Sequence, residues 1–106
     1  TITDSDSLVI QPGVEIKTEN NSQILINGTL IADAENDEPI VFTSESSWKG
    51  IKFDDSEHEN IVRNCQINNA FFSALEINNS TVQVIGNYIY NNAGSTAGAA
   101  LDLTNV

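Results

Sequence analysis

The sequence is short of cysteine, of proline and of long apolar runs, and each shortage narrows the class of protein. Cys65 is the single cysteine among 106 residues, so no internal disulfide can form and the redox compartment cannot be read from it. Two prolines and 40% hydrophobic residues are typical of a folded chain rather than a disordered one. No run approaches the roughly 20 apolar residues of a membrane-spanning helix, so we expect no direct membrane insertion.

Basic residues are also scarce. Four Lys and Arg residues stand against 15 Asp and Glu, which gives a net charge of −11. Because nucleic-acid binding depends on Lys and Arg at the phosphates, this balance argues against a nucleic-acid partner. Anionic membrane surfaces are disfavoured for the same reason. The acidic surface keeps the chain soluble and can attract cations.

Three segments share the order small, apolar, charged, apolar at a regular spacing. Their first apolar residues, Ile51, Leu75 and Leu101, are 24 and 26 residues apart. Side chains alternate between faces along a strand, so each of these residues shares a face with the apolar residue two places on. The charged residues between them would form one outward row: Lys52, Glu76 and Asp102.

A second pair of segments repeats at a similar distance. Residues 64–70 are echoed by residues 87–93, 23 residues later, and Ile61-Val62 matches Val84-Ile85 at the same offset. A fixed period of 20 to 50 residues is the signature of a repeat architecture. Two echoes of one period predict a chain that coils, each coil lying on the previous one and burying a continuous apolar column.

The N-terminal half fits the same coil. Short β-type runs are separated by turn residues, and no segment sustains a helical period. The pair Asn27-Gly28 suits either a two-residue hairpin turn or a corner of the coil, because both residues tolerate positive φ; we expect the corner. The predicted strands are 8–10, 14–16, 24–26, 29–32 and 40–43.

These patterns predict an all-β solenoid of about four coils in one domain, residues 1–106. Residues 1–18 are expected to form a cap or a first partial coil, and residues 19–106 the stacked coils. Few coils leave open ends, which favour end-to-end or homo-oligomeric stacking. The start at Thr1 and the end within an apolar run suggest an excerpt of a longer protein.

A family resemblance appears along residues 8–53. The segments Leu8–Lys17, Ile26–Ala32, Pro39–Ser44 and Trp48–Phe53 resemble the opening of bacterial and archaeal right-handed parallel β-helix proteins of the pectate-lyase-like superfamily. The resemblance implies that fold, an extracellular or cell-surface location, and turn asparagines that stack in hydrogen-bonded ladders. It does not fix an activity, since the fold carries lyases, hydrolases, adhesins and non-catalytic modules.

Two acidic runs, residues 33–38 and 54–59, each follow a predicted strand and start 21 residues apart, near one coil. They could therefore project from neighbouring loops on one side, and converging carboxylates are the ligands that Ca²⁺ prefers. The alternative is two solvated charged loops. A calcium site would draw on Asp33, Asp37, Asp54, Asp55 and Glu57.

A carbohydrate is the other candidate ligand. The outward row of Lys52, Glu76 and Asp102 could contact a sugar or, alternatively, form a ladder of opposite charges. Tyr88 and Tyr90 flank an Asn-rich turn and could stack on a sugar. The chain offers weak catalytic material, because the lone His58 lies in an acidic loop and Cys65 lies within a predicted strand; no catalytic residue is assigned.

We therefore expect a non-catalytic scaffold, adhesin or glycan-binding module whose partners are a carbohydrate or another surface protein. A fragment of a polysaccharide lyase or glycoside hydrolase is the first alternative. A calcium-dependent interaction module is the second. Trp48 is expected to pack at a corner of the coil.

Overall fold

The computed structural model describes residues 1–92 and 101–104 of the chain. This part forms twelve short β-strands and no helix, as the dense Asn, Gly and Ser punctuation predicts. The strands are β1 (Ser7–Ile10), β2 (Glu15–Thr18), β3 (Ile24–Ile26), β4 (Thr29–Asp33), β5 (Ile40–Ser44), β6 (Ile51–Asp54), β7 (Glu59–Arg63), β8 (Cys65–Asn68), β9 (Leu75–Asn78), β10 (Thr81–Ile85), β11 (Tyr88–Tyr90) and β12 (Leu101–Thr104).

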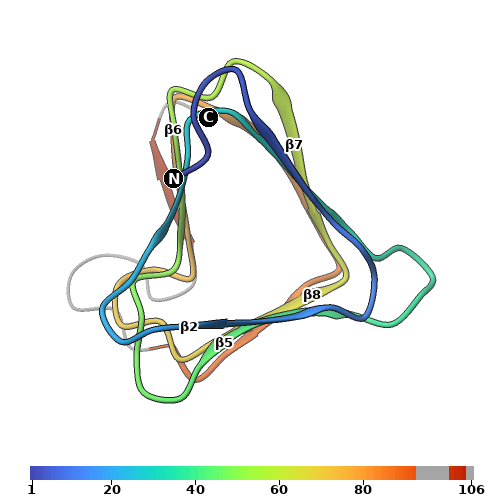
Figure 1. Ribbon diagram of the computed structural model, residues 1–106, viewed down its shortest axis with the longest axis vertical. Helices are drawn as coiled ribbons and strands as arrows, with labels where there is room; N and C mark the ends of the chain where they lie inside the picture. The colour runs from blue at the N-terminus through green and yellow to red at the C-terminus, as the bar shows by residue number, and fades with distance from the viewer. Residues whose placement is uncertain (93–100, 105–106) are drawn as a thin grey trace.

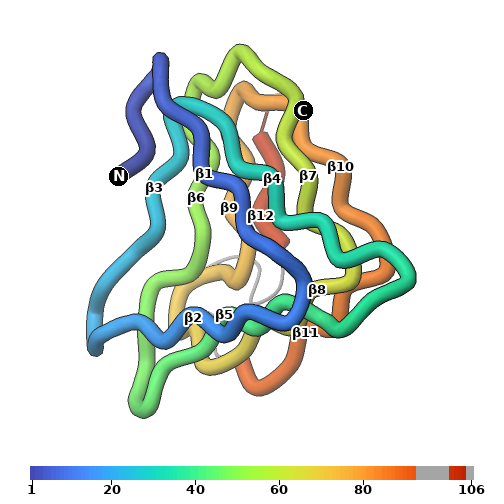
Figure 2. The backbone as a smooth tube through the Cα atoms, turned by 45° about the vertical axis from the view of Figure 1, so that its right-hand side comes forward, coloured from blue at the N-terminus to red at the C-terminus, as the bar shows by residue number. Residues whose placement is uncertain are grey.

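Every third strand belongs to the same sheet. The three sheets have the orders β1-β4-β7-β10, β2-β5-β8-β11 and β3-β6-β9-β12, and every strand pair in the described residues is parallel. The three sheets are the sides of a triangle (Figure 1), and the chain runs clockwise as it recedes from the viewer, so the solenoid is right-handed. Figure 2 shows the four strands of the first sheet side by side. A parallel β-solenoid of about four coils is therefore confirmed.

The first sequence repeat gives the correct register. Ile51 pairs with Leu75, and Leu75 with Leu101, so the charged residues Lys52, Glu76 and Asp102 follow one another on the outer face. Phe53, Ile51 and Leu75 are fully buried. Residue 100 of the third segment lies outside the described residues.

The second repeat was predicted one residue out of register. β8 and β11 pair at an offset of 22 residues, not 23, so Gln66 lies beside Tyr88 and Asn68 beside Tyr90. A one-residue slip moves every side chain to the other face of a sheet. The reason lies at the corner: Gly86, rather than Asn87, takes the place of Asn64 in the next coil. Asn64 and Gly86 both have positive φ. Residue 93 of this repeat lies outside the described residues.

The corners of the triangle are built by asparagine. Six of the seven non-glycine residues with positive φ in the described chain are Asn, which tolerates this conformation better than most residues. Two of them bond through their amide groups to the backbone of a neighbouring coil: Asn69 Nδ2 donates to the Ser44 carbonyl at 2.8 Å, and Asn64 Nδ2 to the Ala34 carbonyl at 2.8 Å. The expected asparagine ladders are thus largely side chain to backbone.

One corner also holds a buried polar group. Asn60 is fully buried, and its Oδ1 accepts a bond from the Leu30 amide at 2.8 Å, while its Nδ2 donates to Ser56 Oγ and to the Thr81 carbonyl. These bonds join three successive coils. No buried side-chain nitrogen or oxygen in the described residues lacks a partner, which is required for a stable interior.

The two ends of the solenoid differ. At the N-terminal end Ile2 pairs with Ile26, which is fully buried. Residues 1–6 continue over the Asn27-Gly28 corner, where the Gly28 amide donates to the Ile2 carbonyl at 3.0 Å. At the C-terminal end the inward residues Leu101 and Leu103 are 42% and 55% exposed. β1 and β2 are ordinary strands of the first coil, so among the residues that the structure describes only 1–6 cover the N-terminal end.

Asn27-Gly28 forms a corner, as predicted, but for a different reason. Neither residue has positive φ. Glycine is needed because any Cβ at position 28 would collide with the carbonyl oxygens of Thr3 and Asp6. The corner is therefore a place where two backbone segments approach closely.

Candidate functional site

The two acidic runs do not lie together. Residues 33–38 leave β4 at the corner that leads to β5, whereas residues 54–59 leave β6 at the corner that leads to β7, and Figure 1 shows these as separate corners of the triangle. The expected juxtaposition is wrong because this coil is longer than the others: Asp33 pairs with Arg63, 30 residues away. Within residues 1–92 and 101–104, no group of three or more His, Cys, Asp and Glu residues is arranged to hold a metal ion.

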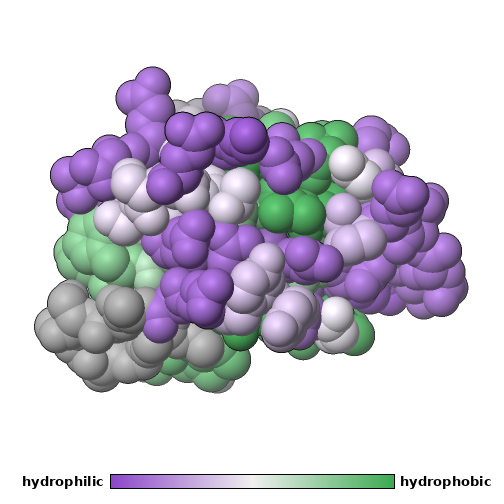
Figure 3. Space-filling model, turned by 90° about the horizontal axis from the view of Figure 1, so that it is seen from below, coloured by the Kyte–Doolittle hydropathy of each residue, from purple (hydrophilic) through white to green (hydrophobic). Residues whose placement is uncertain are grey.

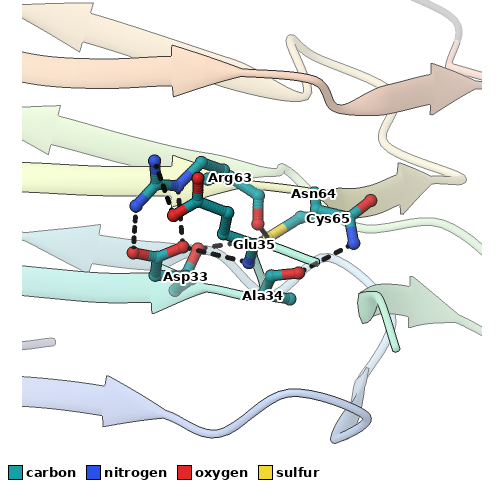
Figure 4. A network of polar contacts seen from close by, with 7 residues as sticks. Asp33, Ala34, Glu35, Arg63, Asn64 and Cys65 are labelled. Atoms are coloured by element: carbon teal, nitrogen blue, oxygen red, sulfur yellow. Dashed lines mark hydrogen bonds and ion pairs between the residues drawn. The ribbon is translucent and has the colours of Figure 1, made fainter. Parts of the chain in front are cut away.

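Asp33 has a different partner. Arg63 Nε donates to Asp33 Oδ1 at 2.8 Å, a second bond runs from Arg63 Nη2 to Asp33 Oδ2, and Arg63 Nη1 lies 3.2 Å from Glu35 Oε2 (Figure 4). The hydrogen bond from Arg63 lowers the pKa of Asp33, and the hydrogen bond to Asp33 raises the pKa of Arg63. This bidentate pair ties β4 to β7.

The outward charged row has the predicted ladder. Lys52 Nζ lies 3.5 Å from Glu76 Oε2, and Asn78 Nδ2 donates to the same oxygen at 3.0 Å. Asp102 follows Glu76 on the next strand, so two carboxylates are neighbours at the C-terminal end of this face. The ladder reading of Lys52 and Glu76 is therefore confirmed.

The two tyrosines lie on a different face. Tyr88 and Tyr90 project from β11 in the sheet of β2, β5, β8 and β11, whereas Lys52, Glu76 and Asp102 belong to the sheet of β3, β6, β9 and β12. The sequence grouped all five as carbohydrate contacts, but the fold does not bring them onto one surface.

The tyrosines form an exposed aromatic platform, which we define as Tyr88, Tyr90 and Gln66. The two rings stack with centroids 4.5 Å apart and an interplanar angle of 23°, and Tyr88 is 62% exposed. Gln66 is the neighbour of Tyr88 across the β8–β11 pair. Within the described chain its side-chain amide makes no hydrogen bond. An exposed ring therefore lies beside a free amide.

Polar side chains on the neighbouring strands β5 and β8 hold Tyr90 in place. Thr43 Oγ1 donates to Asn68 Oδ1, and Asn68 Nδ2 donates to the Tyr90 hydroxyl at 3.0 Å. Asn68 is buried although it points away from the core. Since both ends of its amide are bonded, Asn68 fixes the height and orientation of the Tyr90 ring, on which Tyr88 stacks.

A shallow hollow lies at one edge of this face. It has a volume of about 340 Å³ and is formed where β2 and β5 end. Figure 3 views the face from outside and shows hydrophilic residues over much of it, with hydrophobic residues between them. The hollow is lined by Lys17, Thr18, Glu19, Asn20, Ser44, Glu45 and Ser46.

The remaining residues with reactive or aromatic side chains lie outside the platform. Cys65 is buried, and burial raises the pKa of its thiol to about 11, so it is not a thiolate at neutral pH. His58 is exposed. Trp48 is fully buried at a corner, as predicted, and its Nε1 donates to the Asn68 carbonyl at 2.7 Å.

Sequence reasoning missed Gln66 and Asn68 as parts of a surface site. The signal was present in the alternation of β8, where the apolar residues Cys65 and Ile67 face inward and Gln66 and Asn68 face outward. The offset of 23 concealed it, because that offset placed Cys65, rather than Gln66, beside Tyr88.

No known family, curated protein or solved structure matches the chain. The parallel β-solenoid is therefore established by the geometry of its three sheets. Within the described residues, no helix has the length and apolar character to cross a membrane. The similarity of residues 8–53 to the pectate-lyase-like superfamily stays a resemblance.

Proposed function

We propose that this chain is a non-catalytic, glycan-binding module of a secreted or cell-surface β-solenoid protein. The observation that carries the proposal is the aromatic platform: an exposed, pre-positioned tyrosine ring beside an unbonded amide. Aromatic rings contact the C–H faces of sugars, and amides bond to their hydroxyl groups. Few specific polar groups next to an apolar surface are typical of small-molecule sites.

The rigid support of the platform favours binding. Tyr90 is held by Asn68, and Tyr88 stacks on Tyr90, so little side-chain entropy remains to be lost when a sugar binds. The parallel coils also give a flat, extended surface, which suits a polymer better than a compact ligand. The rest of the solenoid then serves as the scaffold.

The test is binding of the full chain to a panel of immobilised polysaccharides and by titration calorimetry with soluble ones. Tyr88→Ala should weaken binding by about tenfold or more, equivalent to about 1.4 kcal/mol. The matched control is Phe72→Ala, which removes another exposed aromatic ring from the β8–β9 connection and should leave affinity unchanged. Equal losses in both variants, or no binding to any polymer, would refute the proposal.

A polysaccharide-cleaving enzyme is the second candidate. It is favoured by Glu76 and Asp102, which are register neighbours on adjacent strands. Adjacent strands lie about 4.8 Å apart, close to the roughly 5 Å between the carboxyl groups of retaining glycosidases. The same panel tests it: new reducing or unsaturated ends that disappear in Glu76→Gln would favour the enzyme over the binding module.

A further inference from the structure

We infer that the platform takes a neutral polysaccharide and rejects polymers of uronic acids. This inference deepens the proposed function and rests on it, because it specifies the class of glycan for the same surface. It follows from where the few cations of the chain are placed and from what lies beside the platform.

All four basic side chains already have partners. Arg63 is bonded to Asp33, and Lys52 lies 3.5 Å from Glu76. Lys49 lies over the Phe72 ring, 5.5 Å from its centroid. Recognition of a carboxylate depends on a Lys or Arg that is free to form a charge-assisted hydrogen bond. A uronic acid would therefore have to compete with a carboxylate at Arg63 and at Lys52, whereas within the described residues Lys49 keeps its N–H groups free.

Lys17 is the only one of the four cations on the face of the platform. It lies on β2, with Thr43 and Asn68 between its row position and that of Tyr90. Its ammonium group is 3.8 Å from Glu15 Oε1. The hollow beside it adds two more carboxylates, from Glu19 and Glu45. Around this edge the negative charges outnumber the positive one.

The overall charge of the molecule also disfavours the binding of uronic acid polymers. A net charge of −11 gives a negative potential around the whole molecule, which repels polyanions before contact. At the platform, Gln66 and the Tyr88 hydroxyl are neutral hydrogen-bonding groups. Glu19 and Glu45 can accept bonds from sugar hydroxyls, whereas they would repel a second carboxylate. The chemistry of this face thus matches a polymer that carries hydroxyl groups and no charge.

Because Tyr88 and Gln66 are on neighbouring strands, a ligand that contacts both extends across the strands. Neighbouring strands in a sheet are about 4.8 Å apart. This spacing is close to the length of one sugar unit in an extended chain. The polymer would therefore run along the stack of coils, one sugar over Tyr88 and the next over Gln66, toward Val41 in the same row.

The experiment compares neutral and acidic polymers at two salt concentrations. Galactomannan, xyloglucan and glucan serve as neutral probes, and polygalacturonate and alginate as acidic ones. We expect the full chain to bind at least one neutral polymer, with an affinity that changes less than about twofold between low and high salt. Binding to the acidic polymers should be at least about tenfold weaker at low salt, with the difference narrowing as salt screens the repulsion.

Two variants sharpen the result. Gln66→Lys adds a free cation at the platform and should increase binding to polygalacturonate by about tenfold or more at low salt. Gln66→Met is the matched control without charge, and should leave binding to the acidic polymers as weak as in the wild type. Both changes are on an outward, half-exposed side chain, so folding should be maintained.

The possible failures are distinguishable. Acidic polymers that bind the wild-type chain as well as neutral ones do, with the loss of both in Tyr88→Ala, would overturn this inference and leave the glycan-binding function intact. A chain that binds no polymer in the panel would overturn the function and the inference together.

Discussion

The two ends of the solenoid are built from the same kind of coil but differ in how they are finished. At the N-terminal end Ile26 is fully buried beneath Ile2, and hydrogen bonds hold residues 1–6 over the corner that follows. At the C-terminal end Leu101 and Leu103 occupy equivalent inward positions and are largely exposed. The comparison shows that an inward position in a solenoid becomes a core position only when another layer covers it.

The largest effect on stability should come from shortening a buried side chain at the covered, N-terminal end. Ile26→Ala should lower the free energy of unfolding by about 2–5 kcal/mol, because the side chain is fully buried and the structure around a deleted core side chain relaxes only in part. Leu103→Ala should cost about 1 kcal/mol or less, since much of that side chain is already in water. Chemical denaturation measures both; equal costs would mean that the ends do not differ.

The next effect concerns the close approach at Gly28. Gly28→Ala should cost about 2 kcal/mol, because its Cβ would push residues 1–6 away from the corner. Faster hydrogen exchange at the Gly28 and Thr29 amides, which bond to Ile2 and Asp6, would report that movement. The control is Gly86→Ala, which meets no atom within 4 Å and should cost only about 1 kcal/mol through its positive φ. Unchanged exchange at the Gly28 amide in Gly28→Ala would contradict the close approach of residues 1–6 to this corner.

Between the two ends of the solenoid, the Asp33–Arg63 pair should make the stability of the fold depend on pH in the acidic range. The pKa of Asp33 is lower in the folded state, so the unfolded chain binds the proton first as pH falls. The contribution of the pair is present above the ordinary pKa of about 3.8 and is lost as pH drops through the lowered value. Arg63→Met should therefore show a smaller loss of melting temperature between pH 5 and pH 2 than the wild type. An identical pH dependence would show that the pair does not contribute.

The smallest effect on the monomer should come from Leu103→Lys at the open end. Its free energy of unfolding should stay within about 0.5 kcal/mol of the wild type. Self-association, measured by light scattering at rising protein concentration, should decrease, because the exposed apolar strand edge would then carry a charge. In the wild type this association should grow with salt, which screens the repulsion between molecules of charge −11. Association that is unaffected by Leu103→Lys would place the contact elsewhere.

The sequence predicts the fold well because the fold is periodic. The register of β6, β9 and β12 follows from Ile51, Leu75 and Leu101, where apolar and charged residues alternate in the same way in each coil. The Lys52–Glu76 pair follows from that register without further information. Local alternation, repeated at one period, is sufficient for these residues.

Which side chains become neighbours on the outer surface is predicted less well, because this depends on the number of residues in each corner. Matching Asn64 with Asn87 compares residue names, whereas the structure aligns positions of equal backbone conformation, Asn64 and Gly86. Likewise, the acidic runs were assigned to one side on a spacing of 21, while the coil that holds Asp33 and Arg63 takes 30 residues. Corner length varies without changing the strand pattern, so the strands reveal the coil but not which side chains meet outside it.

The segment that covers the first coil also has a consequence for how the chain folds. Residues 1–6 bond to residues 25–29 of the coil that directly follows them in the chain, so this coil and its cover can form from a short stretch of sequence. Every later strand then finds a ready edge about one coil back, 22 to 30 residues away in the chain. Such an arrangement favours folding that starts on one pair of neighbouring coils and spreads to the next, in place of a search among distant partners.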